Sequence, residues 1–158
     1  MSDVTVRPAT AGDCNAIAAV VKESWLGANR DLLPDDTARA VGHCHRLAEV
    51  VTLNWRSIIV AEYGDEIVGT VGLNEQGHIW MLYVTPGHQG LGIGSRLYDA
   101  AIESLRKGGA RKALLEVLAA NENAVAFYRS RGWVPEGRRT EHIPGFRFTA
   151  VRMGLALA

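Results

Sequence analysis

The sequence has no long apolar run and no excess of either charge, and each lack excludes a class of protein. Without a run of about 18 apolar residues, we expect no transmembrane helix. The start, MSDVTVRPAT, lacks the apolar core of a signal peptide. The 17 basic and 17 acidic residues cancel to a formal net charge of zero, which argues against a large nucleic-acid footprint. We therefore expect a cytoplasmic protein that binds neither nucleic acid nor a membrane.

Cysteine is also scarce, with two residues in 158. This number fits reduced thiols in a cytoplasmic protein better than a disulfide framework. Cys14 shares a helical face with Ile17 and Val21 and is expected in the core. Cys44 lies between two histidines, but no further ligands with suitable spacing accompany it. The sequence therefore predicts no metal site.

The length and the hydrophobic content of 47% suit one globular domain over residues 1–158. Apolar periodicity and turn residues predict its elements in order. They are a strand over 3–9, a helix that begins after Thr10 or Asp13 and is broken by residues 32–36, a less regular helix over 36–53, strands over 56–63, 66–74 and 78–84, a helix over 95–107, a strand over 112–118, a helix over 121–131 and a hairpin of 133–140 with 146–155. The crossover after the strand at 78–84 predicts that it lies parallel to the strand at 112–118.

Residues 88–95, HQGLGIGS, carry the most informative motif. They join an apolar strand to a helix through a glycine-rich turn. The first N–H groups of a helix have no intrahelical partner and carry partial positive charge. Glycines let the backbone approach a ligand closely and adopt positive φ. The segment therefore predicts a site for a phosphate or pyrophosphate.

Three glycine-rich patterns compete for this segment. A P-loop needs a lysine where this chain has Ile93, so that pattern fails. A dinucleotide fingerprint needs a third glycine where the chain has Ser95 or Leu97, depending on the starting glycine. The run 89–94, QGLGIG, instead resembles the Gln/Arg-x-x-Gly-x-Gly/Ala signature of the GCN5-related N-acetyltransferases (GNAT family), which binds acetyl-CoA.

A second segment, 112–133, resembles a later block of the same family. It contains a strand with Leu-Glu-Val, then Asn121, then an aromatic-Tyr pair and Gly-Trp. The resemblance covers roughly residues 56–135. It implies a mixed α/β GNAT fold, in which a central, mostly antiparallel sheet contains a splayed parallel pair of strands and is flanked by about four helices.

The resemblance also implies roles for individual residues. Tyr128 is expected to donate a proton to the leaving thiolate; the alternative is a packing aromatic with its hydroxyl at the surface. Glu116 is expected to act as the base; otherwise it faces solvent or pairs with Arg111 or Lys112. Acetyl-CoA is expected to contact Leu82, Tyr83, Val84, Gln89, Gly90, Leu91, Gly92, Ile93, Gly94, Ser95, Asn121 and Tyr128. Asn121 is also expected to cap the following helix.

The acceptor is less determined by the sequence. Trp25, Asn29, Asp31 and Tyr83 are expected near it, and His78 and Trp80 share the strand of Tyr83. The resemblance implies an N-acetyltransferase that moves an acetyl group to a primary amine by direct attack in a ternary complex, because no cysteine lies beside the loop. The amine could belong to a small molecule or a peptide. A protein N-terminal or lysine acetyltransferase, a non-catalytic acyl-CoA sensor and a homodimer stay open.

Overall fold

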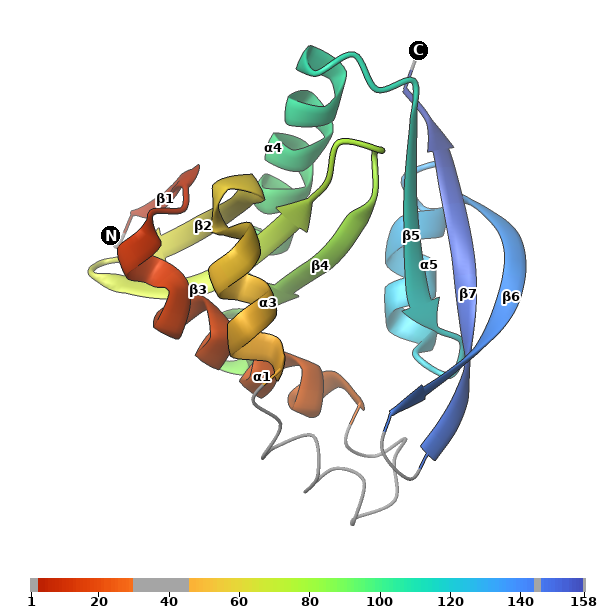
Figure 1. Ribbon diagram of the computed structural model, residues 1–158, viewed down its shortest axis with the longest axis horizontal. Coiled ribbons are helices and arrows are strands. Elements are labelled where there is room, and N and C mark those ends of the chain that lie inside the picture. The colour runs from red at the N-terminus through yellow and green to blue at the C-terminus, as the bar shows by residue number, and fades with distance from the viewer. Residues whose placement is uncertain (1–2, 30–45, 144–145, 158) are drawn as a thin grey trace.

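The computed structural model describes residues 3–29, 46–143 and 146–157 (Figure 1). Two sheets form the frame. The first is antiparallel and has the order β1-β2-β3-β4, and the second has the order β5-β7-β6. The strands are β1 (Val4–Pro8), β2 (Ile58–Tyr63), β3 (Glu66–Leu73), β4 (Ile79–Val84), β5 (Lys112–Leu118), β6 (Val134–Ile143) and β7 (Phe146–Ala156).

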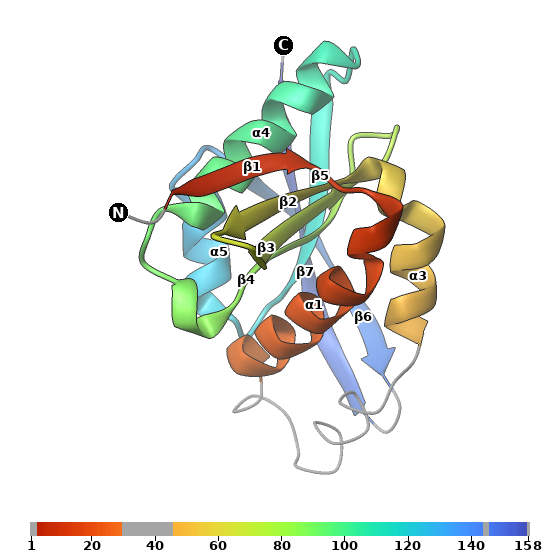
Figure 2. The ribbon, with the colours of Figure 1, turned by 90° about the vertical axis from the view of Figure 1, so that its left-hand side faces the viewer.

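Helices cover both faces of the first sheet (Figure 2). The described helices are α1 (Cys14–Asn29), α3 (Arg46–Asn54), α4 (Ile93–Lys107) and α5 (Glu122–Arg129), with short 3-10 turns at Ala11–Asp13, Trp55–Ser57 and Pro86–His88. The helices α1 and α3 pack on one face, where Ile17 and Val51 join Ile58 and Val60 in a buried cluster. The opposite face is covered by α4. Each such aliphatic side chain contributes about 1.5–3 kcal/mol through burial.

A larger apolar core lies between α4 and the strands. Six buried residues form the apolar stripe of α4: Ile93, Leu97, Tyr98, Ala101, Ile102 and Leu105. This core continues through Leu115 of β5 and Met153 of β7, so it joins the two sheets. The buried Trp133 Nε1–H donates a hydrogen bond to the Tyr98 hydroxyl at 2.8 Å, which ties the start of β6 to α4.

The strands β4 and β5 meet at one point and then separate (Figure 1). His78 and Leu114 form a parallel bridge, and the Leu114 N–H donates to the Gly77 carbonyl at 2.9 Å. Along these two strands, both fully described, no further ladder pair forms. Gly77 has φ +86°, and a Cβ there would lie 2.3 Å from the Lys112 carbonyl oxygen. The close approach of the two sheets therefore requires glycine at this position.

The structure confirms the expected fold class, including the splay that the resemblance implied. The expected strands and the helix at 95–107 lie within a few residues of their predicted bounds. The predicted parallel neighbours β4 and β5 share a single bridge rather than a ladder. Cys14 is half-buried at the edge of its cluster rather than inside it. Some predictions fall outside the described residues. They are the end of the first helix at 32–36, most of the helix over 36–53, the tip of the hairpin and Cys44.

Within the described ranges, no helix combines the length and the hydropathy needed to cross a membrane.

Candidate active site

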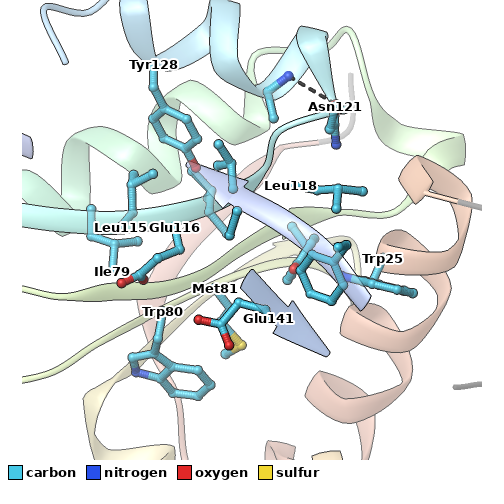
Figure 3. A pocket seen from close by; sticks show the side chains of 16 residues that line it. Trp25, Ile79, Trp80, Met81, Leu115, Glu116, Leu118, Asn121, Tyr128 and Glu141 are labelled. Carbon is cyan, nitrogen blue, oxygen red and sulfur yellow. Dashed lines mark hydrogen bonds between the residues drawn. The ribbon is translucent and has the colours of Figure 1, made fainter. Parts of the chain in front are cut away.

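Two cavities flank the divergence of β4 and β5. The strand cavity, of about 390 Å³, lies between the two strands and is lined by Trp25, Ile79, Trp80, Met81, Leu82, Tyr83, Leu115, Glu116, Val117, Leu118, Asn121, Ala124, Tyr128, Glu141, Phe148 and Ala150 (Figure 3). The loop cavity, of about 620 Å³, is lined by Gly27, Leu82, Val84, Pro86, His88, Gln89, Gly90, Gly92, Ile93, Gly94, Ser95, Asn121, Asn123, Ala124, Phe127 and Tyr128. Four residues line both: Leu82, Asn121, Ala124 and Tyr128. The two cavities therefore adjoin where β4 leaves β5.

The glycine-rich turn forms one wall of the loop cavity. Gly90 and Gly92 have φ of 80° and 78°, and a Cβ on either would meet no heavy atom within 4 Å. Gly92 is the N-terminal cap of α4, so the N–H groups that follow it lack intrahelical acceptors. Gly94 lies inside the first turn of α4 and does not need positive φ. This wall is an open concave surface of backbone donors, which suits an anion.

Of the seven residues predicted in this segment, only Leu91 does not line the loop cavity. Its side chain is 58% exposed. A charged group that sequence reasoning missed lies nearby. The Arg131 guanidinium donates to the Ser95 hydroxyl at 2.9 Å and lies 3.6 Å from the centroid of the Phe127 ring. Because Ser95 and Phe127 both line the cavity, Arg131 adds positive charge beside the start of α4.

The short helix α5 carries Asn121 and Tyr128 to the junction of the cavities. The Asn121 side chain accepts a hydrogen bond from the Ala124 N–H at 3.2 Å, which confirms the predicted cap. Tyr128 is buried, and its ring packs edge-on against Phe127 and Trp133. Figure 3 shows its hydroxyl directed from α5 toward the strands. Burial raises the pKa of Tyr128 above its ordinary value, with smaller contributions from two neighbouring tyrosines. The phenol therefore keeps its proton at neutral pH.

Glu116 lies on β5 with its carboxylate in the strand cavity. Its Oε2 is 2.5 Å from Nε2 of His78, and its Oε1 is 3.7 Å from Nη1 of Arg139. The alternative pairing of Glu116 with Lys112 is wrong, because Lys112 pairs with Glu136 at 2.5 Å. A paired carboxylate with a second oxygen toward a cavity can accept a proton or a hydrogen bond there. The geometry therefore leaves Glu116 able to act as a base.

The far end of the strand cavity mixes aromatic and acidic groups. Trp25 and Tyr83 line it as expected, and burial raises the pKa of Tyr83 to about 12. Trp80 also lines it, with its indole N–H donated to the Leu73 carbonyl at 3.0 Å. His78 does not line the strand cavity; it contacts the Glu116 carboxylate, which does.

Two other residues, Asn29 and Asp31, were also predicted near the acceptor. Asn29 ends α1 and its side chain lies outside the described part of the structure, as does Asp31. Glu141 and Phe148 line the cavity but were missed by sequence reasoning, because both come from the closing hairpin. The alternation of polar and apolar residues along the hairpin does not indicate which cavity its side chains face. Among the described residues, no three His, Cys, Asp or Glu side chains lie close enough together to hold a metal ion.

Comparison with known proteins identifies the family. The model of the acetyltransferase (GNAT) family matches residues 22–133, which include both sequence blocks and most of both cavity walls. The chain belongs to the GNAT acetyltransferase family. A mycothiol acetyltransferase of Corynebacterium glutamicum is 27% identical over 122 residues, covering 73% of this chain and 42% of the relative. The chain thus spans less than half the length of that relative.

Solved structures of GNAT proteins share the fold. A GCN5-related N-acetyltransferase from Rhodopseudomonas palustris superposes with a TM-score of 0.84 at 25% identity, covering 99% of this chain and 97% of that one. The PaiA N-acetyltransferase of Thermoplasma acidophilum, solved in complex with coenzyme A, gives 0.76 at 18% identity over 98% and 99%. A putative acetyltransferase of Salmonella typhimurium, solved with acetyl-CoA, gives 0.72 at 20% identity over 99% and 95%.

Proposed function

We propose that this protein transfers the acetyl group of acetyl-CoA directly to a primary amine. The observation that carries the proposal is the junction of the two cavities at Leu82, Asn121 and Tyr128. One cavity offers backbone donors for a pyrophosphate, and the other offers a carboxylate for an amine. A thioester at the junction is accessible from both. Membership of the GNAT family and the relatives solved with coenzyme A or acetyl-CoA support this cosubstrate.

The loop cavity suits the nucleotide end of acetyl-CoA. The pyrophosphate would contact the N–H groups of residues 89–95, where Gly90 and Gly92 leave the backbone uncovered. The pantetheine arm would follow Leu82–Val84 along the edge of β4 that diverges from β5. Peptide-like amides in that arm can pair with a free strand edge as another strand would. Asn121 and Tyr128 would close the other side.

Glu116 and Tyr128 have different roles in the transfer. The amine nitrogen attacks the thioester carbon, the C–S bond breaks, and Glu116 accepts the proton that the nitrogen loses. Tyr128 donates a hydrogen bond to the sulfur as negative charge develops there. Because burial raises its pKa, the phenol stabilises the thiolate chiefly by this hydrogen bond. His78 orients Glu116 through the 2.5 Å contact.

A small-molecule acceptor is favoured over a protein terminus or lysine. The strand cavity has the volume of a small-molecule site and is walled on several sides by side chains. The curated relatives named mycothiol acetyltransferase point the same way. A non-catalytic acyl-CoA sensor would not need the proton acceptor and donor that flank the junction. It predicts acetyl-CoA binding without amine-dependent release of CoA.

The cofactor assignment is tested by acetyl-CoA calorimetry on three variants. Gly92→Glu places bulk and negative charge in the loop cavity and should weaken binding at least tenfold, which corresponds to about 1.4 kcal/mol. Gly92→Ala measures the cost of the positive φ alone. Leu91→Glu adds the same charge one residue away, on a side chain that points to solvent, and should bind nearly as wild type. If Gly92→Glu binds as tightly as Gly92→Ala, the phosphate site is wrong.

A further inference from the structure

The strand cavity has an uneven distribution of charge. The described residues that line it include the carboxylates of Glu116 and Glu141 and no lysine, arginine or histidine. Figure 3 shows both carboxylates in the same space, with Trp80 and Met81 on one side and Trp25 on another. The cavity therefore combines negative charge with apolar and aromatic walls.

Arg139 lies over both carboxylates but holds neither tightly. Its Nη1 is 3.7 Å from Glu116 and its Nε is 3.6 Å from Glu141, and both distances exceed those of a hydrogen bond. The Arg139 side chain is also 56% exposed. Such loose and exposed ion pairs contribute little to stability. Arg139 can therefore leave this position when another cation arrives.

The two carboxylates differ in how they are paired. Glu116 also makes the short contact with His78 and is assigned above to the reacting amine. Among the described charged residues, Glu141 has Arg139 as its partner. A second cation in the cavity would therefore find Glu141 available once Arg139 moves. Trp25 and Phe148 also line the cavity and give it an aromatic wall.

We propose that the strand cavity selects acceptors that carry a second positive charge: the reacting amine attacks in its neutral form near Glu116, and a second cation replaces Arg139 over Glu141. This inference rests on the proposed function and names its substrate class: small diamines and other amines that carry a second cation. Acceptors with a carboxylate at the same distance would be repelled by Glu141. An acceptor with an apolar end would not displace Arg139 from Glu141, so it would bind less tightly than a diamine.

Three acceptors of matched length test the inference: 1,4-diaminobutane, pentylamine and 5-aminopentanoate. The assay measures kcat/KM for CoA release from acetyl-CoA, together with calorimetric binding of each acceptor to the CoA complex. Wild type should prefer the diamine to pentylamine about tenfold, with the aminopentanoate last. Glu141→Gln should abolish that preference, so the ratio of diamine to pentylamine should fall about tenfold. Glu136→Gln is the matched control, because Glu136 lies on the same strand but pairs with Lys112 outside the cavity.

The failures of the two proposals differ. If pentylamine or aminopentanoate equals the diamine in wild type, or if Glu141→Gln keeps the preference, the inference is wrong while acetyl transfer stands. If the diamine neither binds nor reacts although acetyl-CoA binds, the inference is also wrong. If acetyl-CoA itself does not bind, the proposed function fails first.

Discussion

Replacement of Gly77 by alanine tests whether the contact between the sheets depends on a bare backbone. At φ +86° an L-residue costs about 1–2 kcal/mol. The new Cβ would lie 2.3 Å from the Lys112 carbonyl oxygen, so β5 must move away. This movement weakens the Leu114 N–H···Gly77 hydrogen bond, which is worth about 1 kcal/mol. We expect a total loss of about 2–3 kcal/mol in the free energy of unfolding.

Gly64→Ala is the matched control for this variant. Gly64 also has positive φ, at 63°, but a Cβ there meets nothing within 4 Å. The Gly64→Ala variant should therefore lose only the conformational part of the free energy of unfolding, about 1–2 kcal/mol. Urea unfolding of wild type and both variants measures the difference. Gly77→Ala should also lower kcat more than Gly64→Ala under conditions where both are folded. Equal losses of stability would refute the reasoning, because the contact with Lys112 would then have no cost.

Two further predictions concern single side chains. Tyr128→Phe keeps the ring and should lower kcat about tenfold or more while acetyl-CoA affinity is retained; unchanged steady-state kcat, with chemistry rate-limiting, would leave Tyr128 only a packing role. The Asp13 carboxyl accepts hydrogen bonds from Arg7, which hold its pKa at about 2, below the ordinary 3.8. Its contribution to stability is therefore present above about pH 4 and lost as the pH falls through about 2. Urea midpoints across that range should fall less steeply for Asp13→Asn than for wild type, and equal slopes would contradict this.

Features that depend on neighbouring residues were predictable from the sequence. The glycine-rich turn before α4 follows from the order of strand, glycines and helix, and Gly90 and Gly92 adopt the expected positive φ. The Asn121 cap follows from its place before α5. The helix predicted over 95–107 lies within α4. In each case the forces that fix the conformation act within a few residues.

Features that depend on the splay were not predictable in the same way. Glu116 pairs with His78 and Arg139, which lie far from it in sequence, and not with the adjacent Lys112. Alternation along β5 sends Lys112 and Glu116 to the same face, yet the hairpin supplies Glu136 to one and Arg139 to the other. The placement of Glu141 in the strand cavity depends on how β6 pairs with β7. The periodicity of the sequence does not determine which residues of β6 and β7 pair.

The direct test of the central claim follows the acetyl group itself. Wild type is mixed with acetyl-CoA and a panel of primary amines, and mass spectrometry quantifies CoA, acetylated amine and the intact protein. Direct transfer at the junction of the two cavities predicts one acetylated amine for each CoA released, with the mass of the protein unchanged during turnover. CoA released without acetylated amine would contradict the account. So would an acetylated protein that passes its acetyl group to an amine added later.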